Sequence, residues 1–101
     1  MDNYQLNNKG FCVEFEFTYK NTDNSEVEKR TFRNILQLEG EVFYFNDKMQ
    51  AVKAAEQVLQ SLIADNKYEY GAAIIFHNHE KVENLYFNEN NVVCNGKGNA
   101  F

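Results

Sequence analysis

The sequence has no proline and no tryptophan, and only two cysteines and two histidines among its 101 residues. Cys12 and Cys94 lie far apart, and we expect both to be reduced because nothing indicates a secreted protein. The first ten residues are polar and lack the apolar core of a signal peptide. No apolar run approaches the roughly 20 residues that span a membrane. We therefore expect a cytoplasmic protein, in the host cytoplasm if a phage encodes it.

Positive charge is also scarce. Ten Lys and Arg stand against fifteen Asp and Glu, for a net charge of -5. Nucleic-acid binding relies largely on clustered Lys and Arg that neutralise phosphates. The main basic cluster, formed by Lys29, Arg30 and Arg33, is flanked by Glu26 and Glu28, which largely cancel its field. The composition therefore predicts no direct binding to nucleic acid.

Patterns typical of catalysis are few. The two serines do not lie in a nucleophile-elbow motif, and the sequence has no phosphate-binding glycine loop. One segment, His77-Asn78-His79-Glu80, resembles a metal site. In an extended strand His77 and His79 point to the same side, and Glu80 or Cys94 could complete a zinc site. A plain hairpin turn accounts for the same residues, so we expect no catalytic residue, no metal and no cofactor.

The sequence does contain clear strand patterns. From Phe11 to Lys20 apolar residues alternate with polar ones, as in a strand buried on one face. Residues 21–25 are turn formers, and a second strand is expected from Val27 to about Leu38. Its apolar residues change parity, which predicts a bulge near residues 30–32. A turn at Glu39-Gly40 would then lead to a third short strand over residues 42–45.

One long amphipathic segment follows. Asn46 or Asp47 is a suitable N-cap, and Asn66 is a suitable end. The spacing predicts a helix from about Asp47 to Asp65 that packs through Met49, Val52, Leu59 and Leu62. Further strands are expected over residues 68–77 and 82–87, with a short edge strand at 92–94.

These elements predict an α+β fold. We expect an antiparallel sheet of five or six strands, in the order β-β-β-α-β-β, with one long helix packed on one face. The domain should span residues 11–95, after a polar N-terminal segment (1–10) and before a flexible tail (96–101). The other sheet face must meet water or a partner. Because residues 72–76 are continuously apolar, a homodimer could cover part of that face.

Two sets of residues are candidate binding groups. The acidic set lies on the outer side of the first two strands, and its simplest interpretation is a solvated face with cross-strand ion pairs such as Glu16 with Arg30. Alternatively, this set competes for a basic groove on a partner. The aromatic set is explained either by packing at the core edge or by an interface. The acidic candidates are Glu14, Glu16, Glu26 and Glu28, and the aromatic candidates are Tyr44, Tyr70 and Tyr86.

Composition suggests where such a protein would act. Fifteen Asn, eight Lys, two Arg and no Pro indicate an AT-rich gene, as in phages, mobile elements or low-GC bacteria. We expect a non-enzymatic binding protein that blocks or modulates a macromolecular partner. The preferred hypothesis is a small phage- or mobile-element inhibitor of a host nucleic-acid-handling defence complex, of the anti-CRISPR kind. The alternatives are a structural or assembly subunit, a toxin antidote, or a small metal-dependent enzyme that uses His77, His79 and Glu80.

Overall fold

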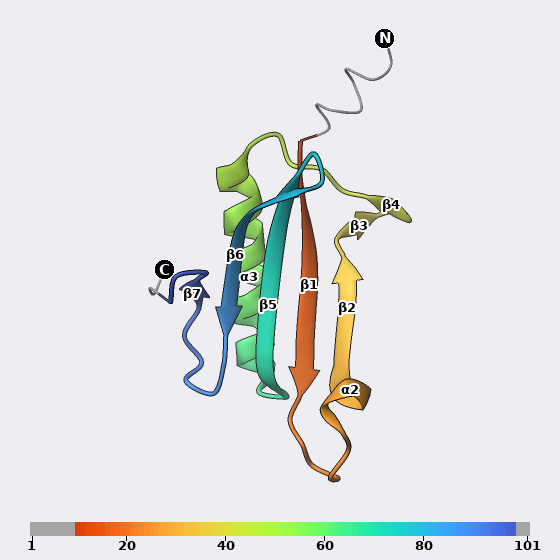
Figure 1. Ribbon diagram of the computed structural model, residues 1–101, viewed down its shortest axis with the longest axis vertical. Helices are drawn as coiled ribbons and strands as arrows, with labels where there is room; N and C mark the ends of the chain where they lie inside the picture. Colours follow the sequence, from red (N-terminus) through yellow and green to blue (C-terminus); the bar gives the residue numbers. More distant parts are fainter. Residues whose placement is uncertain (1–9, 99–101) are drawn as a thin grey trace.

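A computed structural model describes residues 10–98 (Figure 1). Five antiparallel strands form one sheet in the order β2-β1-β5-β6-β7, and the long helix α3 lies along one face of it. This arrangement confirms the predicted α+β class. Of the expected terminal segments, residues 1–9 and 99–101 lie outside the described residues.

Strand β1 (Phe11–Tyr19) follows the predicted alternation. Val13 and Phe15 are buried in the core beneath α3, whereas Glu14 and Glu16 lie on the opposite face. Alternate side chains of a strand point to opposite faces, so the sequence pattern alone decides which residues of β1 meet the helix.

Strand β5 (Tyr68–His77) occupies the centre of the sheet, between β1 and β6 (Glu80–Phe87), as its apolar run predicted. Asn78 and His79 connect β5 to β6 with positive φ at both residues, 53° and 71°, which suits a tight hairpin turn. Gly71 lies against the ring of Phe87, and a Cβ at this position would come 2.3 Å from that ring. The core therefore requires glycine here. The short strand β7 (Cys94–Asn95) completes the far edge.

Helix α3 spans Lys48–Asp65. The Asp47 carboxylate accepts a hydrogen bond from the Gln50 backbone N–H at 2.8 Å, and Asn66 ends the helix in the left-handed conformation. Both predicted ends are confirmed. The buried face consists of Ala51, Val52, Ala55 and Leu59, and its alanines let the helix approach the sheet closely.

The predicted packing role of Met49 is wrong, since its side chain is 61% exposed. Successive residues turn by about 100° around a helix axis. Met49 therefore lies roughly 120° from the centre of the face formed by Ala51, Ala55 and Leu59. Leu62, which belongs to that face, packs against the core as expected. No helix within residues 10–98 is long and apolar enough to cross a membrane.

The second predicted strand is partly wrong. Val27–Arg30 form one helical turn, α2, and only Thr31–Ile35 form strand β2. The Thr31 hydroxyl donates a hydrogen bond to the Val27 carbonyl at 2.8 Å, which closes this turn. The apolar residues change parity in this segment because a helical turn precedes β2. Within the described residues the predicted bulge is absent.

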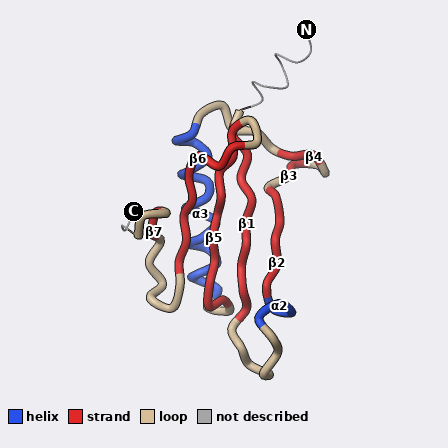
Figure 2. The backbone as a smooth tube through the Cα atoms, viewed as in Figure 1, coloured by secondary structure: helices blue, strands red, loops and turns tan. Residues whose placement is uncertain are grey.

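The third predicted strand does not join the main sheet. Strands β3 (Gln37–Leu38) and β4 (Glu41–Val42) form a separate hairpin, visible beyond the end of β2 in Figure 2. The predicted Glu39-Gly40 turn is confirmed, with positive φ at both residues. Between β4 and α3, Phe45 forms an isolated bridge with Phe11 of the main sheet.

The helix packing gives a direct stability test. Leu59 is fully buried, so Leu59→Ala should lower the free energy of unfolding by about 2–5 kcal/mol, because it removes buried atoms and leaves a cavity. Met49→Ala is the matched control and should change it by less than about 0.5 kcal/mol. Urea unfolding of both variants measures the difference. Equal losses would contradict the helix orientation.

Candidate functional site

The sheet has one face that α3 does not cover, and we call it the open face. Cross-strand pairing places Arg33, Glu16, Ala72 and Tyr86 in one row across β2, β1, β5 and β6. Neighbouring rows add both apolar and polar side chains. The centre of the open face consists of Glu14, Glu16, Arg33, Tyr70, Ile74 and Phe76.

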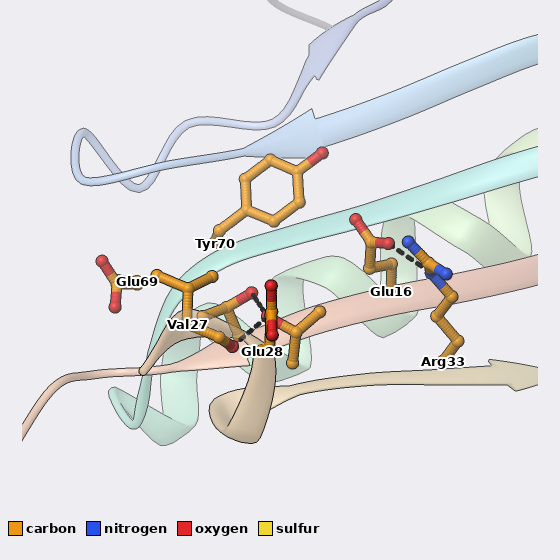
Figure 3. A pocket seen from close by; sticks show the side chains of 8 residues that line it. Glu16, Val27, Glu28, Arg33, Glu69 and Tyr70 are labelled. Atoms are coloured by element: carbon orange, nitrogen blue, oxygen red, sulfur yellow. Dashed lines mark hydrogen bonds and ion pairs between the residues drawn. The ribbon is translucent and has the colours of Figure 1, made fainter. Parts of the chain in front are cut away.

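Near α2 the open face contains a hollow of about 770 Å³, here called the acidic hollow. Glu16 from β1, Glu28 from α2 and Glu69 from β5 stand around it, with the ring of Tyr70 on one side (Figure 3). The hydroxyls of two further lining residues, Thr18 and Thr31, are hydrogen-bonded to each other at 2.8 Å. Three strand and helix segments therefore bring carboxylates to one place.

Ion pairs neutralise part of this charge. Arg33 Nε contacts Glu16 Oε2 at 2.6 Å, and this hydrogen bond raises the pKa of the Arg33 guanidinium. Arg30 pairs with Glu69. The expected pair of Glu16 with Arg30 is wrong, because the helical turn α2 removes Arg30 from the strand and leaves Arg33 opposite Glu16.

The other acidic residues remain available. Neither Glu14 nor Glu28 forms an ion pair within residues 10–98. Glu26, also predicted for this set, is exposed in the loop before α2 and does not line the acidic hollow. The open face is therefore negative on balance, and most strongly so where Glu28 borders the hollow.

The predicted aromatic set is divided. Tyr70 and Tyr86 share the open face, and the pKa of Tyr70 is raised by burial, with smaller effects of Glu16 and Tyr86. Tyr44 lines a separate hollow of about 380 Å³ toward the other end of the open face, together with Cys12 and Phe76. We call this the Tyr44 hollow. Tyr70 and Tyr86 thus lie on the same sheet face as the acidic hollow.

Glu69 is a site residue that the sequence interpretation missed. It lies between two tyrosines at the start of a strand read as apolar. The only sequence signal is a charged residue between two aromatic ones. This pattern does not indicate which face of the sheet the Glu69 side chain lies on. Its position follows from the pairing of β5 with β1, where the register shifts between Thr18 and Tyr19.

The histidines occupy different surroundings. The His77 ring stacks on Phe11 with 4.3 Å between ring centroids, and its Nδ1 donates to the Gly10 carbonyl at 2.9 Å. His79 lies in the turn and borders the Tyr44 hollow. The backbone between them is a turn, and the extended conformation assumed for this pair is absent. Within residues 10–98, including Glu80, no three His, Cys, Asp or Glu side chains are grouped to hold a metal ion.

Comparison of the chain with protein-family models, with curated proteins and with solved structures finds no match in any of the three. The function must therefore be inferred from the residues of the open face and their chemistry.

The negative field of the open face can be measured at Cys12. Burial raises the pKa of this thiol, and Glu14 raises it further. In a Cys94→Ser variant, alkylation of Cys12 should reach half its maximal rate at a higher pH than for a cysteine peptide measured alongside. Adding Glu14→Gln should lower that pH. A midpoint at or below that of the peptide, or no response to Glu14→Gln, would contradict this.

Proposed function

We propose that this protein is a non-enzymatic binding protein that uses its open face to block or modulate a macromolecular partner. One observation carries the proposal: a sheet face without a helix layer presents aromatic and aliphatic side chains beside unpaired carboxylates. Outward positions of a half-covered antiparallel sheet are normally polar, whereas here they include Tyr70, Ile74 and Phe76. Apolar surface of this kind is typical of interaction sites.

The charge on the open face indicates the chemistry of the partner. Glu14 and Glu28 face outward without ion pairs in the described chain, and Glu16 and Glu69 each retain carboxylate surface beside one arginine. A partner with a basic groove would complement this pattern. Grooves of that kind occur in complexes that handle nucleic acids, where Lys and Arg bind phosphates.

The biological setting is part of the same proposal. Small size, a net charge of -5 and an Asn-rich, Pro-free composition support an inhibitor encoded by a phage or mobile element, of the anti-CRISPR kind. A structural subunit or a toxin antidote would use the same open face, and the identity of the bound partner separates these alternatives.

Charge reversal tests the role of the acidic residues. The protein should retain from host lysate a complex that nucleic acid displaces. Against that complex, the triple variant Glu14→Lys, Glu16→Lys, Glu28→Lys should associate about tenfold more slowly or worse, because electrostatic steering acts mainly on association. Surface-plasmon kinetics at two salt concentrations measure the effect, which should shrink as salt rises.

The matched control reverses the same number of charges elsewhere, at Glu39, Glu41 and Glu89, which are all exposed. Its association rate should stay much closer to that of the native protein. Equal slowing in both triple variants would mean that only net charge matters. An unchanged rate in the first variant would leave the acidic residues as an ordinary solvated surface.

Aromatic residues of the open face should act on the dissociation rate, whereas the acidic residues act on the association rate. Truncating a buried interface ring removes contact area and usually costs more than about 1 kcal/mol at a hot spot. Tyr70→Ala and Tyr86→Ala should therefore raise the dissociation rate about fivefold or more and leave association nearly unchanged. Tyr44→Ala, outside the acidic hollow, serves as the comparison. Slower association without faster dissociation would contradict this assignment.

The proposal also requires that the protein does not bind duplex DNA itself. The net charge is -5, and duplex binding needs many phosphate contacts. In ~150 mM salt, fluorescence anisotropy should show a Kd weaker than ~100 μM for a duplex oligonucleotide. Tighter binding with a steep salt dependence would contradict a partner-directed mode of action.

A further inference from the structure

We propose that a hollow on the helix side of the sheet, at the end of β1, binds a nucleoside phosphate. This basic hollow has a volume of about 480 Å³ and lies between the end of β1, α2 and the turn after α3. Four of the ten Lys and Arg residues of this acidic chain line it: Lys20, Lys29, Arg30 and Lys67. The inference is independent of the proposed function, which concerns the open face.

Two of these cations are held in place. Lys20 Nζ donates to Asn66 Oδ1 at 2.7 Å. Arg30 donates through Nε to the Ser25 carbonyl at 3.0 Å and through Nη1 to the Tyr19 carbonyl at 2.7 Å. Its Nη2 makes no hydrogen bond within residues 10–98, where no buried side-chain nitrogen lacks a partner. In the proposed site, Nη2 is the donor that Arg30 turns toward the ligand.

The carboxylates near the hollow cancel only part of this charge. Among residues 10–98, Asp23 is the single acidic residue that lines it. The Asp23 carboxylate accepts hydrogen bonds from the hydroxyl and the backbone N–H of Ser25, which lower its pKa. Asp23 thus stays charged and offsets one of the four cations. Glu69 pairs with Arg30 from the side of the acidic hollow, so it weakens the field of one cation out of four.

The hollow also has aromatic walls. Tyr19 and Phe32 line it and are 37% and 46% exposed. Their ring centroids are 5.5 Å apart, and both belong to a cluster with Phe17 and Tyr68. Helix α3 packs on β1, β5 and β6, and β2, which contains Phe32, lies to one side of it (Figure 1). The packed rings beneath hold Tyr19 and Phe32 firmly at the surface.

Exposed rings beside lysines favour a ligand that is both planar and anionic. A bare phosphate would pair with the lysines and leave the rings in water. An apolar ligand would cover the rings and leave the cations unpaired. A nucleoside phosphate satisfies both, because any base stacks on an aromatic ring and Lys acts as a point charge for phosphate. The volume falls within the roughly 300–1,000 Å³ of small-molecule sites.

The ligand is a free nucleotide and not a duplex. In a duplex the bases are stacked on one another, so Tyr19 and Phe32 would have no base face to contact. The hydroxyls of Thr22 and Ser25 and the amide of Asn66 line the same hollow and supply donors and acceptors for a base edge or a ribose.

The test is an amide NMR titration of the full chain with adenosine 5′-monophosphate at ~50 mM salt, beside separate titrations with adenosine and inorganic phosphate. The monophosphate should give saturable shifts, with a Kd of ~1 mM or tighter, centred on residues 19–32 and 66–68. Adenosine and phosphate should each bind several-fold more weakly. Equal binding of phosphate and the monophosphate, or no saturation by about 10 mM, would overturn the proposal.

Variants separate the two parts of the site. Phe32→Ala should weaken binding of the monophosphate about tenfold by loss of stacking and leave binding of phosphate unchanged. Lys20→Ala with Lys67→Ala should weaken both about fivefold. The control pair Lys53→Ala and Lys81→Ala, exposed and outside the hollow, should weaken neither. Equal effects of both lysine pairs would mean that the anion is attracted by net charge and not by this hollow, and would overturn the proposal.

Glu69→Gln gives a result that a purely structural role would not produce. Glu69 partly neutralises Arg30 from the acidic hollow, so removing its charge while keeping an acceptor should tighten binding of the monophosphate about twofold to threefold. Unchanged or weaker binding in a folded Glu69→Gln protein would show that Arg30 does not contribute, and would overturn its place in the site.

Discussion

The buried guanidinium of Arg30 determines how one end of this molecule is built. It is the only charged side chain among residues 10–98 that the fold buries. A buried charge is costly unless it is paired and hydrogen-bonded. Here two backbone carbonyls and the Glu69 carboxylate supply those partners. The end of β1, the following loop, α2 and the start of β5 must therefore keep their relative positions, and both the acidic and the basic hollow depend on this arrangement.

Arg30 also explains where sequence reasoning succeeded and failed. The alternation of β1 depends only on the period of its side chains, and each end of α3 depends on one capping residue. Both are local signals, and both were predicted. The helical turn at Val27–Arg30 was not, because its stability comes partly from Glu69, which lies far away in the sequence. The same pairing places Glu69 at the acidic hollow. Glu14 and Glu16 were assigned to the correct face because period alone decides that.

The basic hollow could not be predicted from sequence for a related reason. Lys20 and Lys67 are distant in the chain and meet only because the Lys20 N–H bonds to the Lys67 carbonyl at the end of the sheet. Phe32 was expected in a bulge, and its ring is instead held beside Tyr19 by the cluster of four rings. Net charge describes the whole chain, whereas recognition depends on how folding sorts the charges. This fold sets carboxylates and cations on opposite sides of the Arg30–Glu69 pair.

The pairing of β1 with β5 has a consequence for how the chain acquires its structure. Phe15 pairs with Ala73, whereas β1 and β2 are joined by residues 20–30, which include α2. Because β2 is the next strand after β1 and β5 comes much later in the chain, synthesis exposes β1 and β2 before their remaining partners exist. Until then one edge of β1 is unpaired and its apolar face is uncovered. Sheets that depend on such distant pairings fold slowly. The interval before β5 emerges is thus the period in which this small protein is most exposed to aggregation.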